Sequence, residues 1–184
     1  MNNLLIVTNY QNKYLTGSSS NPLAKLIEQE IVKKVEDYLA EDKWVVFSYV
    51  DSNEPDAENW ETENPDSLKK LLQEHDDDII QLRTGSDDLV KLLSAFKPWS
   101  TIEVCGIYAE NGIITNVNTV LSAIGESESK KILVDCNAIA GSSNETKSKA
   151  IDILKSMNIC VYVEVKTEES LFANEEASNE LSEI

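Results

Sequence analysis

Few residues of this 184-residue chain could carry covalent or acid–base chemistry. Cys105, Cys136 and Cys160 each lie in or beside a short apolar run, where a free thiol behaves as a small hydrophobe. Their number is odd and their spacing matches no metal motif, so we expect three reduced, mostly buried thiols and a reducing compartment. His75 is the only histidine, and without a second one the Ser-His-Asp and Cys-His arrangements have little support.

The charge balance excludes several classes of partner. The chain has 16 Lys+Arg against 33 Asp+Glu, a formal net charge of −17. Such a surface repels phosphate backbones and anionic lipids, and the sequence contains no dense basic cluster, so we predict no nucleic-acid partner and no membrane partner. No apolar run approaches the ~20 residues that span a bilayer, and the N-terminus has no basic segment of a secretory signal. These features favour a cytoplasmic protein.

The elements that must position any site alternate along the chain. Short apolar runs rich in valine and isoleucine are separated by segments of helical periodicity, a pattern typical of parallel strands that are covered on both faces. The predicted strands are 3–8, 44–50, 78–82, 101–107, 131–135 and 159–165. The predicted helices are 22–39, 67–75, 87–96, 112–124 and 144–157. Helices that cross between parallel strands predict a three-layer α/β fold.

Length and composition predict a single folded domain over residues 1–167, followed by an acidic C-terminal tail over 168–184. The acidic stretch 51–66 is expected to be an exposed loop. The serine-rich segments TGSSSN and AGSSNE are interpreted as helix starts, because neither ends in the Gly-Lys-Ser/Thr that a phosphate loop needs.

In open parallel sheets, ligands bind beyond the carboxyl ends of the strands, where the strand order reverses. Polar residues follow several of the predicted strands at that edge. They are Asn9-Tyr10-Gln11, Asp51, Arg83, Tyr108–Gly112 and Cys136-Asn137.

Two of these segments resemble the isochorismatase-like cysteine hydrolases, a superfamily that includes nicotinamidases, isochorismatases and carbamoyl hydrolases. NLLIVTNYQNKYLTG resembles the family's first strand with its D-x-Q-N-D-F-like loop. VCGIYAENGIITNVNTVLSAIG resembles the V-C-G-x-x-T-D-x-C-V nucleophile segment, and KKILVDCNAIAGSSNETKSKAIDILKSMNICVY is similar to the strand, helix and strand that follow it. The resemblance covers about residues 3–165. It implies a Rossmann-like fold, a six-stranded parallel sheet of order 3-2-1-4-5-6, and a homo-oligomer.

The family uses a cysteine nucleophile, an aspartate base and a lysine to attack an amide carbon. In this chain Asn9 occupies the aspartate's position and Gly112 the nucleophile's, while Arg83 stands nearest to the lysine's. Glycine cannot form a thioester, and asparagine cannot take up a proton at neutral pH. The resemblance therefore implies a degenerate, non-hydrolytic member, a pseudoenzyme with no catalytic residues of the family type.

A binding function could survive that loss. The backbone N–H groups that begin the helix at Gly112 would favour an anion, and Arg83 could pair with it. We therefore expect a small carboxylate or amide as ligand, although Glu110 would oppose an anion. The candidate binding residues are Asn9, Tyr14, Arg83, Tyr108, Asn111 and Gly112, with Tyr14 and Tyr108 as aromatic walls.

We predict no cofactor and no metal ligands. Family members with a metal use a D-x-H motif, and Asp51-Ser52-Asn53 lacks the histidine that zinc or iron prefers. A hard cation in the acidic loop 51–66 is an alternative.

Two further hypotheses stay open. One is an active hydrolase of amide or related C–N bonds with rewired groups, for example Cys136 or Glu110. The other is an unrelated α/β regulatory module, which a different strand order would support. A pseudoenzyme could also act through protein contacts, with an active relative as partner.

Overall fold

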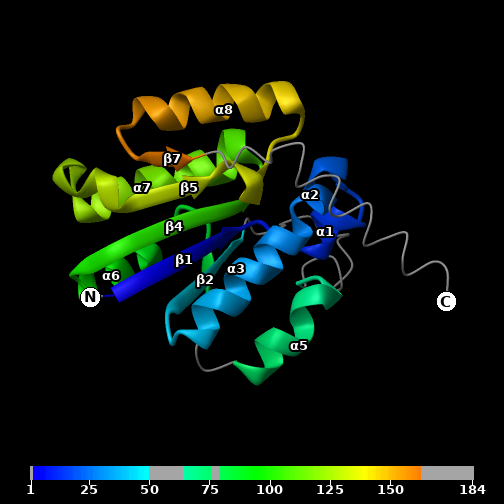
Figure 1. Ribbon diagram of the computed structural model, residues 1–184, viewed down its shortest axis with the longest axis horizontal. Coiled ribbons are helices and arrows are strands. Elements are labelled where there is room, and N and C mark those ends of the chain that lie inside the picture. Colours follow the sequence, from blue (N-terminus) through cyan, green and yellow to red (C-terminus); the bar gives the residue numbers. More distant parts are fainter. Residues whose placement is uncertain (1, 50–63, 76–78, 163–184) are drawn as a thin grey trace, which may run out of the picture.

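The computed structural model describes residues 2–49, 64–75 and 79–162, and its centre is a parallel β-sheet (Figure 1). Six strands are hydrogen-bonded in the order β3-β2-β1-β4-β5-β7, and a two-residue strand, β6, pairs with β4. The predicted order is confirmed, with β7 as the sixth predicted strand. The bounds are β1 Asn2–Thr8, β2 Trp44–Tyr49, β3 Ile79–Arg83, β4 Trp99–Ile107, β5 Ile132–Asp135, β6 Ile139–Ala140 and β7 Cys160–Tyr162.

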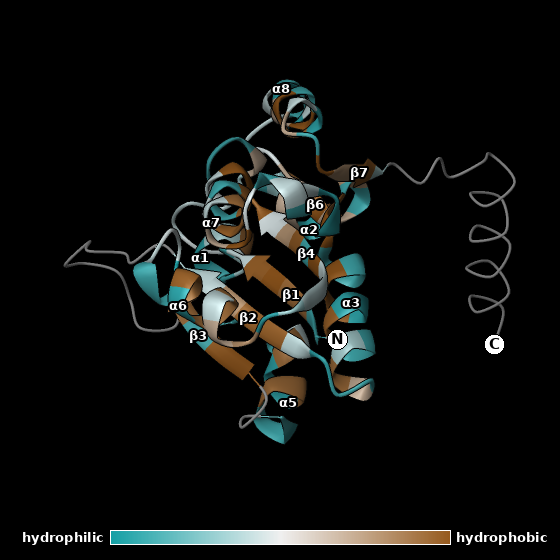
Figure 2. Ribbon diagram, turned by 90° about the vertical axis from the view of Figure 1, so that its left-hand side faces the viewer, coloured by the Kyte–Doolittle hydropathy of each residue, from teal (hydrophilic) through white to brown (hydrophobic). Residues whose placement is uncertain are grey.

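Helices cover both faces of this sheet, so the predicted three-layer architecture is confirmed. Helices α3 (Glu28–Ala40) and α5 (Asp66–Glu74) pack on one face. Helices α6 (Asp87–Ala95), α7 (Ile114–Ile124) and α8 (Asn144–Ser156) pack on the other. Figure 2 views the layers from the side, with α6 and α7 to the left of the strands and α3 to their right.

The apolar runs form strands because both of their faces are buried. In β1, Leu4 and Ile6 contact the cluster beneath α6 and α7, whereas Leu5 and Val7 contact the cluster beneath α3. All four side chains are fully buried. Because successive side chains of a strand point to opposite faces, a strand buried on both must be continuously apolar.

Both serine-rich loops begin helices, as predicted. The Asn21 side chain accepts a hydrogen bond from the Leu23 N–H and caps α2 (Pro22–Leu26). Ser143 and Thr146 form a reciprocal capping box at the start of α8. The predicted helix 22–39 is in fact two helices, α2 and α3, that meet at Ile27.

The helix predicted to begin at Gly112 differs at its start. Residues Ala109–Ile113 form a π-helical turn, η2, and α7 begins at Ile114. The N–H groups of Asn111 and Gly112 both donate to the Tyr108 carbonyl, at 3.0 and 2.8 Å. The Tyr108 carbonyl thus accepts the first hydrogen bonds of the turn.

A buried ion cluster links α3 to the sheet, and no sequence motif had indicated it. The Lys34 ammonium lies 2.9 Å from Oε1 of Glu103 in β4 and 2.9 Å from Oδ2 of Asp135 in β5. The Tyr38 hydroxyl donates to the other oxygen of Glu103 at 3.1 Å. Burial disfavours the charge on Lys34, but the hydrogen bonds and charges of the two carboxylates outweigh it and raise the pKa of Lys34.

Within residues 2–49, 64–75 and 79–162, no helix is long and apolar enough to cross a membrane. The acidic tail 168–184 and most of the acidic loop 51–66 lie outside these residues. The three cysteines are free thiols, as expected, with Cys105 and Cys136 buried.

Candidate functional site

Asn9 and Gly112 meet at the carboxyl ends of β1 and β4. A Cβ built on Gly112 would lie 2.7 Å from Nδ2 of Asn9 and 2.7 Å from Cγ2 of Thr8. The fold therefore brings together the two positions at which the resemblance expects a base and a nucleophile. They lie where the strand order reverses between β1 and β4, the usual ligand edge of an open parallel sheet.

The space beside Gly112 is occupied. Carbon atoms in van der Waals contact stand about 3.5–4.0 Å apart, so a Cβ at 2.7 Å from two side-chain atoms would overlap both. The carbonyl oxygen of Ile107 closes a third side at 3.2 Å. Thr8 is fully buried and Asn9 is 2% exposed, so neither side chain can turn out into solvent without rearrangement of its surroundings. A thiol at position 112 has no room unless β1 side chains shift.

A chain of hydrogen bonds holds these side chains in place. The Asn116 amide, on α7, donates to Oγ1 of Thr8 at 2.8 Å and to Oγ of Ser48 at 3.1 Å. The Ser48 hydroxyl donates to Oγ1 of Thr84 at 2.9 Å, and the Thr84 hydroxyl donates to Oδ1 of Asn9 at 3.4 Å. We call these five residues, Thr8, Asn9, Ser48, Thr84 and Asn116, the polar plug.

The polar plug joins three strand ends to one helix without a charge. Its members are amides and hydroxyls, none of which ionises near neutral pH. It can donate and accept hydrogen bonds, but it offers no general base and no activated nucleophile. The plug therefore links the ends of β1, β2 and β3 to α7 through neutral hydrogen bonds.

Arg83 is the exposed last residue of β3, and the next residue, Thr84, begins a turn. The Thr84 hydroxyl lies against Oδ1 of Asn9, and the Thr84 N–H donates to the Tyr49 carbonyl at 2.7 Å. A neutral hydroxyl thus reaches Asn9 from the end of β3, directly after the residue that we expected to supply a cation.

Tyr14 and Tyr108 contact each other, as an edge-to-face pair with ring centroids 5.1 Å apart. Both pack against the apolar cluster on the α3 face, whereas Asn116 reaches Thr8 from the α7 face. Burial, followed by the nearby Tyr14 and Glu110, raises the pKa of Tyr108. Asn111 is exposed. The two tyrosines thus contribute to the packing on the α3 face of the sheet.

The expected anion site at the start of the helix is not supported by the geometry. The N–H groups of Asn111, Gly112 and Ile113 all donate to the Tyr108 carbonyl, so they do not point at a ligand. Glu110 adds a carboxylate beside them, and its Oε1 accepts a hydrogen bond from the Ser142 N–H at 3.0 Å. This correction arises because η2 replaces the regular helix start that would leave those donors open.

Two of the three cysteines, Cys105 and Cys136, lie in environments that disfavour the thiolate. Burial, together with the Glu103 carboxylate, raises the pKa of Cys105 well above its ordinary value. Burial also raises the pKa of Cys136, although Lys147 partly offsets the effect. Since the thiolate is the nucleophile, these two thiols are poor candidates for a replacement catalytic group. The Cys160 thiol donates to the Lys130 carbonyl at 3.3 Å.

No protein-family model matches the sequence, and no curated protein matches it. Solved structures do resemble the fold. A pyrazinamidase/nicotinamidase from Streptococcus mutans superposes with a TM-score of 0.73 at 14% identity, covering 87% of this chain and 99% of that one. An N-carbamoylsarcosine amidase from Thermoplasma acidophilum gives 0.66 at 14% identity over 91% and 100% of the two chains.

An isochorismatase family protein from Desulfovibrio vulgaris gives a TM-score of 0.68 at 14% identity, covering 93% of this chain and 98% of that one. The chain thus has the α/β fold of the isochorismatase-like and nicotinamidase-like hydrolases over nearly their whole length. Identities this low establish the fold alone.

Four members of the polar plug escaped the sequence interpretation. Thr8, Ser48, Thr84 and Asn116 are small neutral residues at strand ends or on a helix, and such residues match no catalytic motif. Asn116 alone had a usable signal, because it lies four residues after Gly112 and hence one helical turn further along.

Proposed function

We propose that this chain is a non-hydrolytic member of the isochorismatase-like superfamily, which keeps the hydrolase fold as a scaffold for protein interaction. One observation carries the proposal: the position of the nucleophile is a glycine, and the space for any side chain there is filled by Thr8 and Asn9.

The proposal rests on the loss of two groups together. Gly112 supplies no thiol, and Asn9 supplies no base. Nucleophilic catalysis needs the nucleophile and its base within hydrogen-bond reach of each other. Removing both eliminates the mechanism rather than slowing it. The neutral side chain of Asn9 is instead hydrogen-bonded within the polar plug.

Protein interaction is favoured over a small ligand at the carboxyl edge of the sheet. One support for a carboxylate there is lost, because the N–H groups of Asn111, Gly112 and Ile113 donate to the Tyr108 carbonyl. The rewired hydrolase is also disfavoured, because burial raises the pKa of Cys105 and of Cys136 and so keeps both thiols protonated.

The proposal predicts no turnover of the family's substrate classes. The purified chain is incubated with nicotinamide, with an N-carbamoyl amino acid and with isochorismate, and product release is followed beside an active nicotinamidase. We expect rates at the no-protein background, since no group in the crevice can attack a carbon. Turnover that scales with protein concentration and disappears in Asn9→Ala would contradict the proposal.

A further inference from the structure

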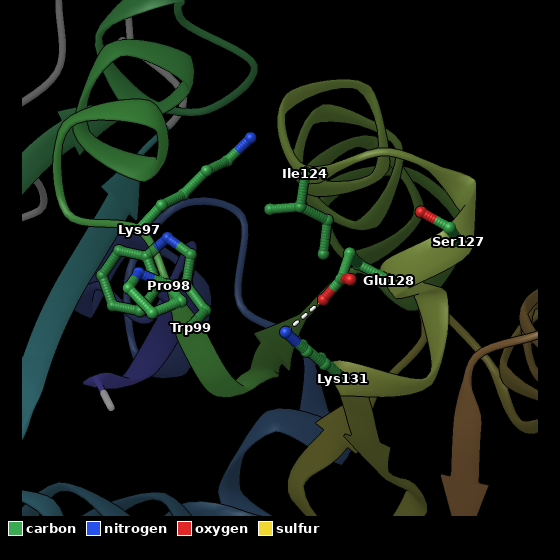
Figure 3. Close-up of a pocket in the computed structure, with 7 residues that line it drawn as sticks. All are labelled: Lys97, Pro98, Trp99, Ile124, Ser127, Glu128 and Lys131. Carbon is green, nitrogen blue, oxygen red and sulfur yellow. Dashed lines mark ion pairs between the residues drawn. The ribbon is translucent and has the colours of Figure 1, made fainter.

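A pocket lies at the opposite edge of the sheet, where β4 and β5 begin (Figure 3). Its volume is about 330 Å³, at the lower end of the ~300–1,000 Å³ of small-molecule sites. Lys97, Pro98 and Trp99 form one side, and Ile124, Glu128 and Lys131 form the other. The polar plug is at the carboxyl ends of the strands, so this pocket shares none of its residues.

The charge of this pocket is unusual for such an acidic chain. Two cationic side chains, Lys97 and Lys131, and one carboxylate, Glu128, line it, although the whole chain carries −17. Two other pockets lined by described residues differ in this respect. One, of about 370 Å³, is lined by Glu126 without a cation, and a groove of about 630 Å³ is lined by one cation, Lys25, and one carboxylate, Glu28.

Each of the two ammonium groups has a partner that holds it in place, and each retains N–H groups that could bind a ligand. The Lys97 ammonium donates to the Ala123 carbonyl, near the end of α7, at 2.8 Å. That bond uses one of its three N–H groups and offsets the negative end of the helix dipole. Lys131 is paired with Glu128, one turn earlier on η3 (Glu126–Lys131). Side-chain exposures of 36% and 39% leave this pair accessible to a competing anion.

The remaining walls are apolar. Pro98, Trp99 and Ile124 line the pocket between the lysines. Trp99 is 2% exposed, and its indole N–H already donates to the Leu93 carbonyl at 2.7 Å, so it forms the buried base of the pocket and offers no free hydrogen bond. Apolar walls with a few convergent polar groups are the usual composition of a small-molecule site.

We propose that this pocket binds a small organic anion, one with a single carboxylate on a flat apolar body about the size of one ring. The carboxylate contacts the free N–H groups of Lys97 and competes with Glu128 for Lys131, while the ring lies against Pro98 and Ile124. Such a site would operate whether or not the crevice at Gly112 is inert.

The test is an NMR titration of the full, ¹⁵N-labelled chain with sodium benzoate at constant ionic strength. We expect saturable shifts of amides at Trp99 and in η3. Lys97→Gln should weaken binding at least about fivefold, because one charge-assisted hydrogen bond is lost. Lys131→Gln should weaken it in the same direction. Lys149→Gln, which changes an exposed lysine of α8 far from these walls, should leave the affinity unchanged.

Benzamide serves as the neutral probe of the same shape, and it should bind several-fold more weakly than benzoate. The proposal is overturned if benzoate causes no saturable shifts at this pocket, if the shifts map to Asn9 and Gly112, or if Lys97→Gln and benzamide both match wild type with benzoate. Because the lysines are accessible and surface-facing, both variants are expected to fold, which the amide spectrum itself reports.

Discussion

Replacing Gly106 by alanine should cost at least about 3 kcal/mol of the free energy of unfolding. Gly106 has a φ of +122°, which L side chains rarely adopt, and it pairs with Thr8 across β1 and β4. A Cβ there would lie 2.1 Å from the Thr8 carbonyl oxygen and 2.7 Å from its nitrogen. Because both atoms belong to the backbone of a central strand, the clash is relieved only by separating β1 from β4.

Urea unfolding followed by circular dichroism measures this effect, and Gly125→Ala is the matched control. Gly125 also has a positive φ, +94°, but nothing lies within 4 Å of its Cβ position. The control should therefore show backbone strain alone, about 1 kcal/mol. If Gly106→Ala is no less stable than Gly125→Ala, the close approach of β4 to Thr8 that positions the crevice is wrong.

Replacing Lys34 by methionine should cost about 3 kcal/mol, the second largest effect that we expect. The change keeps the apolar stem but leaves Glu103 and Asp135, both buried, without their shared cation. Two unpaired buried carboxylates repel each other and lose their hydration, which is the costly way to break a buried ion pair. Methionine is close enough in length that packing against the sheet is retained.

Chemical unfolding at neutral pH measures this loss, with Lys149→Met as control. Lys149 pairs with Glu145 on the exposed face of α8, so its removal should change stability by less than about 0.5 kcal/mol. The pairing raises the pKa of Lys34, so its stabilisation is complete below the ~10.4 of an unfolded lysine and is lost only as pH rises through the higher folded value. A cost below about 1 kcal/mol for Lys34→Met would show that the cluster is not a buried ion pair.

The sheet could be predicted from the sequence because its strands are buried on both faces. In a run such as NLLIVT, apolar and polar residues do not alternate. A strand needs such a continuous apolar run only when helices cover both of its faces. Short elements could not be predicted. Ile139–Ala140 is too short to show a period, and the break between α2 and α3 at Ile27 interrupts neither the apolar stripe nor the spacing of four.

The sequence predicted which chain positions lie together at this edge of the sheet better than it predicted which side chains interact there. Asn9 and Gly112 were expected together and lie together, because parallel strands end at one edge. Thr84, which no motif had marked, follows the predicted Arg83 and donates its hydroxyl hydrogen bond to Asn9. Likewise, no sequence motif marks Lys34, and only the fold reveals its two carboxylates.

The most direct measurement of the central claim is the labelling rate of the thiol introduced by Gly112→Cys, with iodoacetamide at pH 6 and peptide mass spectrometry. If Thr8 and Asn9 fill the space, the new thiol is buried against neutral groups and labels no faster than Cys105 of the same molecule. Cys105 is fully buried and also reports any unfolding that the substitution causes. Labelling many-fold faster than Cys105 in the folded variant would reveal an open crevice that activates a thiol, and would contradict the account.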